Sequence, residues 1–264
     1  MDNPLPPLTL TPLQQIPLIR QADNLADILL SSLPASGLTL QNGDILVLAQ
    51  KIVSKAEGRM VDLATVTPSP RAVELAAQAE KDPRVVELML RESREVLRVR
   101  VGAVIVEHNL GFVCANAGID HSNVSPLGAN PVERADDYVL LLPENPDRSA
   151  AEIRAQIKSK AGVNVGVLII DSHGRAWRNG TVGVTIGLAG MPGLVDLRGQ
   201  PDLFGYTLRV TQVGAADELA AAASLMMGQA AEGTPAVHVR GFPYPLREGT
   251  LGELIRPKDQ DMFR

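Results

Sequence analysis

The sequence predicts an α+β protein, an irregular mixed α/β arrangement in which helices flank mixed sheets, rather than a doubly wound parallel sheet. The reason is that short apolar runs typical of strands and amphipathic runs typical of helices do not alternate strictly along the chain. Aromatic residues make up only 3% of the 264 residues, so the core of this fold must consist of Ala, Val, Leu and Ile. A chain of this length can bury a substantial core, in one large or two small domains.

The N-terminal elements each follow from a local pattern. Residues 8–13 alternate apolar side chains with Thr or Pro, which predicts a first strand, and 16–19 form a compact apolar turn. A short helix is expected over 25–33, where a proline and a glycine end it. The apolar run at 44–53 predicts a strong strand.

The next segment predicts two helices followed by a pair of strands. Helices are expected at 71–81 and 83–94, the second with Pro83 in its first turn, where proline is tolerated. Strands are expected at 96–106 and 111–115, joined by an Asn-containing turn.

The middle of the chain predicts an excursion, a strand and a helix. Residues 127–137 are expected to form the excursion, and 138–142 the short strand. Ser149 can cap the N-terminus of a helix over 150–160, and Glu152 three positions later would complete a capping box.

The C-terminal third combines β structure with one helix. A glycine-rich β stretch is expected to end at Gly190, followed by a loop to Gln200. Alternation predicts a strand over 206–213, the Ala-rich run 215–227 predicts a helix, and 236–240 predicts a last strand.

Composition excludes several classes of function. A net charge of −5 and few aromatic residues argue against a nucleic-acid partner. The uncharged stretch from Asn179 to Val195 is broken by five glycines and a proline, so it cannot span a membrane. One cysteine excludes an internal disulfide and fits a reducing compartment, and the first residues lack the basic region of a signal peptide. We therefore expect a cytoplasmic protein.

The most informative segment is an apolar run followed by polar residues. Residues 165–170 fit a fully buried strand, and Asp171, Ser172 and a glycine turn carrying two arginines come next. A carboxylate beside a hydroxyl and arginines at the mouth of a sheet suits a hard metal ion and phosphates. The alternative is a hairpin turn capped by its own side chain.

A second acid follows a strand of the same kind. The short apolar strand after Phe112 ends in small residues, Asp120 and Asn123. Asp120 and Asp171 are about fifty positions apart, so only the fold can bring them together. Together they would make an oxygen-rich site for Mg²⁺ or Mn²⁺. The four histidines and the single Cys114 show no zinc-ligand spacing.

The common phosphate-binding motifs are absent. No Gly-Lys dipeptide and no pair of glycines two positions apart occurs, which excludes a P-loop and the dinucleotide fingerprint. Lys51 and Lys55, expected to leave the end of a strand, could neutralise phosphate or could be solvated. The loop 227–234 could form a backbone collar around phosphates, with Gln229 as an oxygen ligand, or an ordinary helix C-cap.

Four motifs together carry a family resemblance. They are Ser54–Arg59, Asn116–Asn123, Asp171–Gly180 and Met227–Pro235, in that order. The chain resembles the coenzyme F420-0:L-glutamate ligase family over about residues 8–241. This resemblance implies a GTP-dependent γ-glutamyl ligase. It also leads us to expect a single catalytic unit over 1–264, without the flavin-reductase-like C-terminal domain of some members.

The resemblance also assigns roles to individual residues. It implies that Asp120 and Asp171 are catalytic and, with Ser172 and Gln229, bind two divalent ions, Mg²⁺ or Mn²⁺; K⁺ is a further candidate ion. Ser172 stands where the family often has Thr, which keeps the hydroxyl. The implied nucleotide contacts are Ile16, Pro17, Leu18, Ile19, Gln50, Lys51, Lys55, Asn123, Met227, Gly228, Gln229, Ala230, Ala231, Glu232, Gly233 and Thr234. Arg175, Trp177 and Arg178 are candidates for contacting the substrate, although a half-buried Trp beside a surface Arg is the default for the last two.

The implied partners are the F420 precursor, L-glutamate, the co-substrate GTP and a second copy of the chain. The family resemblance implies a homodimer of two intertwined subdomains, with the active site near the interface. The apolar stretch Gly180–Val195 would be costly to expose, so a twofold interface could cover it, unless it folds back inside its own subunit.

The expected chemistry is activation of a carboxylate. Phosphoryl transfer from GTP would give an acyl phosphate, which the amine of L-glutamate then attacks. Two alternatives stay open. The chain could be a metal- and nucleotide-dependent amide ligase on another acid, or a non-catalytic GTP-binding protein.

Overall fold

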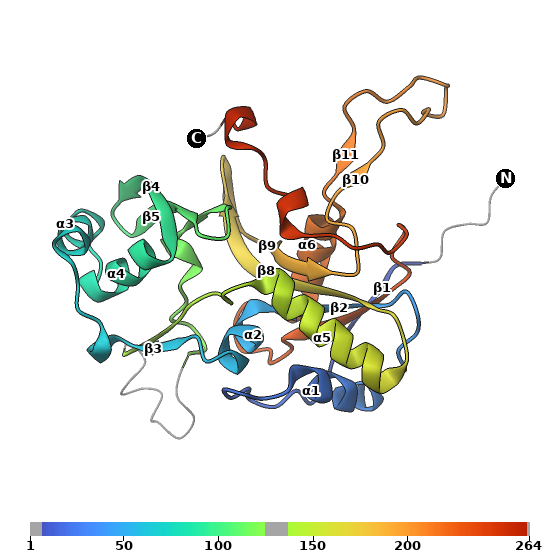
Figure 1. Cartoon of the computed structure of the whole chain (residues 1–264), viewed down its shortest axis with the longest axis horizontal. Helices are drawn as coiled ribbons and strands as arrows, with labels where there is room; N and C mark the ends of the chain where they lie inside the picture. The colour runs from blue at the N-terminus through green and yellow to red at the C-terminus, as the bar shows by residue number, and fades with distance from the viewer. Residues whose placement is uncertain (1–6, 125–136, 263–264) are drawn as a thin grey trace.

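A five-stranded mixed sheet lies at the centre of the molecule (Figure 1). The computed structural model describes residues 7–124 and 137–262. Across the sheet the strands are β1 (Thr9–Pro12), β12 (Ala236–Arg240), β2 (Ile45–Ala49), β8 (Gly166–Arg175) and β9 (Arg178–Ala189). Neighbours β2 and β8 are parallel, whereas the other neighbouring pairs are antiparallel. The carboxyl ends of β2 and β8 therefore meet at the same edge.

Helices cover both faces of this sheet. Helices α1 (Leu25–Ser32) and α5 (Pro146–Ala161) lie on one face and α6 (Ala215–Met227) on the other (Figure 1). Side chains alternate accordingly, because successive residues of a strand point to opposite faces. Leu46 and Leu48 of β2 join the core with α1 and α5, while its Ile45 and Val47 join the core with α6. Because β2 is buried on both faces, its residues form a continuous apolar run in the sequence.

Glycines in β9 allow the two long helices to approach closely. A Cβ at Gly183 would lie 2.5 Å from the Ala220 carbonyl oxygen of α6, and one at Gly187 would lie 2.3 Å from Pro146 Cβ of α5. No residue from 183 to 195 is exposed. Most of the stretch Gly180–Val195 is thus covered by its own chain, and the argument that it needs a second copy to cover it is wrong.

The strands and helices of residues 60–140 form a second lobe with its own core. Helix α2 (Gln50–Ala56) leads into it but packs its Ile52 and Val53 into the core of the central sheet. The elements of the lobe are β3 (Met60–Asp62), α3 (Pro70–Ala79), α4 (Pro83–Arg91), β4 (Ser93–Arg100), β5 (Ala103–His108), β6 (Val113–Ala115) and β7 (Tyr138–Leu140). Strands β4, β5 and β6 form one antiparallel sheet, and β3 pairs with β7. The core here includes Leu63, Val86 and Met89. Phe112 packs against this core and against both cores of the central sheet.

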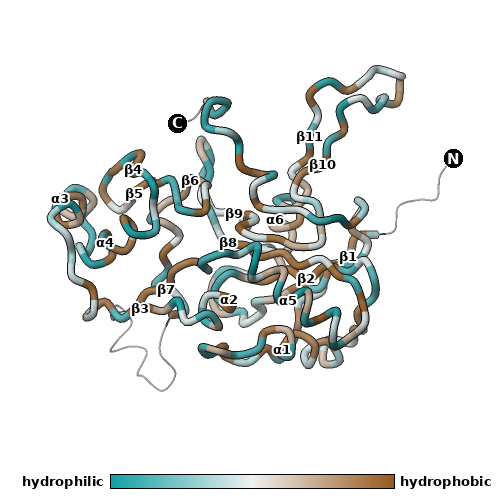
Figure 2. Tube along the Cα trace, in the orientation of Figure 1, coloured by the Kyte–Doolittle hydropathy of each residue, from teal (hydrophilic) through white to brown (hydrophobic). Residues whose placement is uncertain are grey.

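An arm projects from the central sheet (Figure 1). Strands β10 (Val195–Asp196) and β11 (Gln212–Val213) pair at its base. Leu203 and Phe204 are 98% and 95% exposed, and Figure 2 shows hydrophobic segments along the arm. Of the strand expected over 206–213, only Gln212–Val213 forms a regular strand. The rest of that segment pairs with 197–202 through irregularly spaced backbone hydrogen bonds, which do not make a continuous ladder.

Three other sequence predictions need correction. The strand expected at 96–106 is split into β4 and β5 by a turn at Val101–Gly102, where Gly102 has a left-handed φ of 81°. Helix α5 begins at Pro146 with Asn145 as its N-cap, so the capping box at Ser149 is wrong. The strand expected to reach residue 53 ends at Ala49, where α2 begins.

Short 3-10 turns complete the fold. They are Pro34–Ser36, Leu63–Thr65, Asn116–Gly118, Leu251–Glu253 and Lys258–Gln260. The excursion expected at 127–137 lies outside the described residues, apart from its last position. Within the described ranges, no helix has both the length and the apolar character needed to cross a bilayer.

Candidate active site

A cavity of about 1190 Å³ opens at the carboxyl ends of β2 and β8. The register explains its position. Ala49, the last residue of β2, pairs with Ile170, so β8 continues from Asp171 to Arg175 with no β2 beside it. Ligand sites in sheets of this kind form at the carboxyl ends of parallel strands. The free edge of β8 thus forms one wall of the cavity.

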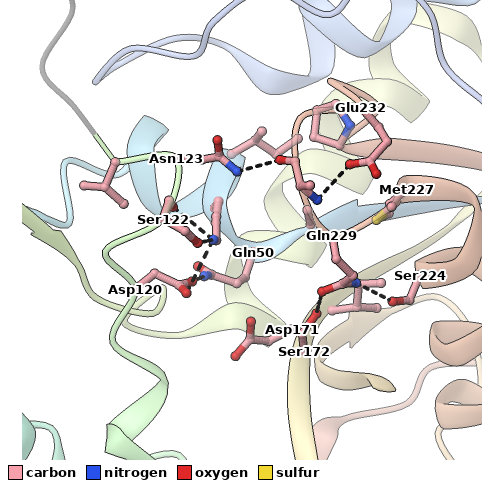
Figure 3. Close-up of a pocket in the computed structure, with 18 of the residues that line it drawn as sticks. Gln50, Asp120, Ser122, Asn123, Asp171, Ser172, Ser224, Met227, Gln229 and Glu232 are labelled. Atoms are coloured by element: carbon pink, nitrogen blue, oxygen red, sulfur yellow. Dashed lines mark hydrogen bonds and ion pairs between the residues drawn. The ribbon is translucent and has the colours of Figure 1, made fainter. Parts of the chain in front are cut away.

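Asp171 and Ser172 lie within β8, not at its end. The turn that closes the β8–β9 hairpin is Ala176–Trp177, so the interpretation of Asp171 as part of the hairpin turn is wrong. Ser172 Oγ donates to Gln229 Oε1 at 2.8 Å, and Gln229 Nε2 donates to Ser224 Oγ at 3.0 Å (Figure 3). Ser172 therefore faces the end of α6, and Asp171, the next residue back, faces the opposite side of the strand.

Asp120 reaches the cavity from the second lobe through a left-handed turn. Asn116, Ala117 and Gly118 have φ values of 54°, 52° and 64°. This conformation costs about 1–2 kcal/mol at a non-glycine residue such as Ala117. Asn116 compensates in part, because its Oδ1 accepts a hydrogen bond from the Val104 amide at 3.0 Å. The turn aims the following residues at β8.

The carboxylate of Asp120 contacts two residues of α2, but these contacts do not offset the cost of its negative charge. Gln50 Nε2 donates to Asp120 Oδ2 at 2.7 Å, and Lys51 Nζ lies 3.4 Å from Oδ1 (Figure 3). Burial raises the pKa of Asp120 to about 6, Lys51 opposes this shift, and the negative charge of Asp171 adds to it. A half-buried carboxylate that lies beside a second carboxylate forms a site that favours a bound cation.

The two lysines lie on a helix, which corrects the prediction that they leave a strand. Lys51 and Lys55 are one turn apart on α2. Lys51 Nζ donates to Ser122 Oγ at 2.8 Å, and Lys55 Nζ donates to the Asn123 carbonyl at 2.8 Å. Burial and then the charge of Lys51 lower the pKa of Lys55. Both ammonium groups are thus fixed at the wall of the cavity.

The loop after α6 closes the other side. Gly228 has a φ of 73°, and a Cβ there would lie 2.2 Å from Glu232 Cδ. Glu232 Oε2 accepts from the Ala230 amide at 2.8 Å, and Asn123 Nδ2 donates to the Ala230 carbonyl at 3.0 Å (Figure 3). The loop is therefore tied across the cavity to the second lobe, which an ordinary helix C-cap would not require.

The structure brings most of the predicted site residues together. The cavity is lined by all four predicted metal ligands, Asp120, Asp171, Ser172 and Gln229, and by every residue predicted to contact the nucleotide, Ile16–Ile19, Gln50, Lys51, Lys55, Asn123 and Met227–Thr234. The three candidate substrate residues, Arg175, Trp177 and Arg178, do not line it. They surround the β8–β9 turn, where Trp177 is 88% exposed.

Sequence reasoning missed residues that orient the others. Ser54 Oγ donates to Gln50 Oε1 at 2.8 Å, which turns the Gln50 amide nitrogen toward Asp120. His173 Nε2 lies 3.0 Å from Asp171 Oδ2. The spacing of His173, two residues after Asp171 on a strand, could have revealed that both side chains share a face.

Comparison with known proteins agrees with this geometry. A family model described as F420-0:Gamma-glutamyl ligase matches residues 14–241. The chain belongs to this family. Similar proteins include the coenzyme F420:L-glutamate ligases of Methanothermobacter thermautotrophicus (44% identical over 97% of this chain and 99% of that protein), Methanopyrus kandleri (45%, 98% and 99%) and Archaeoglobus fulgidus (40%, 96% and 95%).

The donor set of this F420-0:γ-glutamyl ligase family member fits hard divalent cations. Among residues 7–124 and 137–262, no three His, Cys, Asp or Glu side chains gather as a metal-binding group. The cavity instead offers two carboxylates, the Ser172 hydroxyl and the Gln229 amide oxygen. Mg²⁺ and Mn²⁺ prefer such oxygen ligands and complete their coordination with water and phosphate. Asp120, Asp171, Ser172 and Gln229 are the residues that would hold them.

Proposed function

We propose that this chain catalyses the GTP-dependent addition of L-glutamate to F420-0, followed by a γ-linked glutamate, and that residues 1–264 act as one catalytic unit. One observation carries the proposal. Asp120 and Asp171, from different lobes and about fifty residues apart, face one cavity that also contains two lysines and the 227–234 loop. Family membership supports the choice of substrates.

The first step activates the acid. An oxygen of the F420-0 carboxylate attacks the γ-phosphorus of GTP, the bond from that phosphorus to the β–γ bridging oxygen breaks, and GDP leaves. Bound divalent ions would supply charge neutralisation for the phosphates and the acyl oxygen. Lys51 and Lys55 present positive charge to the phosphates, and Asn123 with the 227–234 loop encloses the nucleotide.

The second step forms the amide. The neutral amine of L-glutamate attacks the acyl carbon, the bond from that carbon to the phosphate oxygen breaks, and inorganic phosphate leaves with the electron pair. The amine loses a proton to phosphate or solvent. This route needs no nucleophilic side chain. The residues of the cavity contribute positioning, exclusion of water and electrostatic stabilisation.

Mass spectrometry tests the proposal directly. The full chain is incubated with F420-0, L-glutamate and Mg²⁺ or Mn²⁺, with GTP in one arm and ATP in another. We expect products heavier by one and then two glutamate residues, with one GDP and one phosphate released for each. Carboxylate labelled with ¹⁸O should pass label to the phosphate if the acyl phosphate forms.

Two results would replace the proposal by its alternatives. Turnover with a different acid but not with F420-0 would indicate an amide ligase of other specificity. Saturable GTP binding without turnover of any acid would indicate a non-catalytic GTP-binding protein.

We also propose that the chain forms a homodimer. The exposed side chains of the arm support this, because Leu203, Phe204 and Val210 are 98%, 95% and 85% exposed and suit burial against a second copy. Light scattering at micromolar and nanomolar concentration should give the mass of two chains. A Phe204→Ser variant should shift it toward one. A fully active particle of one chain's mass would exclude the dimer.

A further inference from the structure

The Asp171 carboxylate has a partner, His173, to which the proposed reaction assigns no role. His173 Nε2 lies 3.0 Å from Asp171 Oδ2, and the two side chains are 12% and 11% exposed. Both residues lie on β8, two positions apart, so they project from the same face of the strand. The contact is therefore a local consequence of strand geometry.

The chemistry of the contact fixes its direction. An ionised carboxylate only accepts hydrogen bonds, so His173 Nε2 must carry the hydrogen and donate it. This occupies one side of Oδ2 and leaves Oδ1 free for the cavity. A single hydrogen bond of this kind restricts rotation about the last bond of the aspartate side chain, and thus sets the plane of the carboxylate.

The ring of His173 is supported from the second lobe. Phe112, in the connection between β5 and β6, packs against it with ring centroids 5.2 Å apart at 54°. The ring of Phe112 in turn stacks on His108, at 5.2 Å and 12°. His108 is itself anchored, because its Nδ1 accepts from the Leu110 amide at 3.0 Å. The packing of the two lobes thus bears on the orientation of Asp171.

We propose that His173 is a positioning residue that orients Asp171 toward a divalent cation, and that Phe112 holds the His173 ring in place. The inference deepens the proposed function and rests on it for the role of the cation in ligation. Partners in contact with a metal ligand typically contribute 10–100-fold to metal affinity. Because cation binding can be measured without turnover, the two proposals can fail separately.

The test uses Mn²⁺ binding to the full chain, followed by the electron paramagnetic resonance of free Mn²⁺, with no acid substrate present. His173→Leu keeps the volume of the ring but removes the donor, and should weaken Mn²⁺ binding about 10–100-fold. His173→Gln keeps a donor nitrogen near the Nε2 position and should bind within about threefold of the wild type. Phe112→Leu should weaken binding less than His173→Leu does.

A neighbouring residue supplies the matched control. Val182 on β9 is paired with His173 in the β8–β9 register and makes no hydrogen bond to Asp171 through its apolar side chain. Val182→Ala should leave Mn²⁺ binding unchanged. The melting temperature of the metal-free protein should be similar in the two His173 variants and in Val182→Ala, which separates positioning from a general loss of folding.

The outcomes are decisive in both directions. The proposal is overturned if wild-type chain does not bind Mn²⁺, if His173→Leu binds it as tightly as the wild type, or if Val182→Ala weakens binding as much as His173→Leu. Rescue by His173→Gln with an unchanged melting temperature supports it. If the variants bind Mn²⁺ with the expected affinities but the chain does not ligate F420-0, the proposed function is overturned and the role of His173 stands.

Discussion

An aspartate lies near each end of strand β2, and the two differ in burial and in the number of their hydrogen-bond partners: Asp44 is buried and Asp120 is half-buried. Asp44, directly before the strand, is 2% exposed. Arg240 donates to it through Nε at 2.9 Å and Nη2 at 2.7 Å, and the Gln41 amide donates at 2.8 Å. His238 Nε2 lies 2.9 Å from Oδ2. Two nitrogens of Arg240, the Gln41 amide and His238 therefore surround this carboxylate.

Asp120, beyond the other end of the strand, has fewer partners. It receives one hydrogen bond from Gln50 and lies 3.4 Å from Lys51. Burial would raise the pKa of either acid, but at Asp44 the hydrogen bonds from Arg240, His238 and Gln41 outweigh it and lower the pKa. Burial wins at Asp120, where the pKa rises to about 6. A structural acid is saturated with donors, whereas a functional acid keeps positions open for a ligand.

The largest effect on activity is expected when the two acids of the cavity are neutralised. Asp120→Asn and Asp171→Asn each remove an anionic ligand and keep the shape, so ligation should fall about a thousandfold, equivalent to about 4 kcal/mol of transition-state stabilisation. The melting temperature of metal-free Asp120→Asn should not fall, because the charge that this substitution removes is only partly compensated. Near wild-type turnover of both variants at limiting metal would refute the site assignment.

The opposite result is expected at Asp44. Asp44→Ala leaves Arg240 and the Gln41 amide without their acceptor, so the free energy of unfolding should fall by about 3 kcal/mol. Ligation per folded molecule should be unchanged. Urea unfolding measures the loss. Glu152→Ala is the control, since the exposed Glu152–Arg148 pair should contribute less than about 1 kcal/mol. An equal fall in the free energy of unfolding in the two variants would contradict the conclusion that the hydrogen bonds to Asp44 stabilise the fold.

The pH dependence of that loss sharpens the comparison. The folded-state pKa of Asp44 lies below its ordinary value of 3.8, so its stabilisation is complete above the unfolded-state pKa and disappears as the pH falls through the folded-state pKa. The difference in unfolding free energy between wild type and Asp44→Ala should be constant from about pH 5 to 7 and should narrow below about pH 4. Urea titrations at several pH values would show this, and a difference that grows toward acid would contradict it.

The smallest effect is expected at the lysine farther from Asp120. Lys55→Ala removes positive charge from the cavity wall without removing a metal ligand, so the KM for GTP should rise about tenfold while Mn²⁺ affinity changes little. Calorimetry with GTP and the Mn²⁺ titration measure the two separately. Lys158→Ala, an exposed lysine on α5, is the control. Unchanged GTP binding in Lys55→Ala would make Lys55 a surface residue without a role.

The sequence alone determined those elements whose signals are local. The helix at 215–227 and the strand at 236–240 have the predicted bounds, because an Ala-rich run between two glycines and a short apolar run after a proline each specify one conformation. The residues of the site motifs could also be identified from the sequence. The motifs contain Asp120, Asp171, Ser172 and Gln229, and the fold brings these residues to the same cavity.

Only the tertiary structure decided which of those residues meet and which surfaces are covered. Asp120 and Asp171 share a cavity because β2 ends at Ala49 while β8 continues, and no local pattern contains that register. The sequence does not show what covers the glycine-rich stretch of β9. In the structure, α5 and α6 pack directly on its glycines. The alternation at 206–213 forms an irregular arm, because its backbone hydrogen bonds to 197–202 do not continue as a regular ladder. Periodicity specifies the faces of an element, but the neighbour that fills each face is set by contacts far apart in the chain.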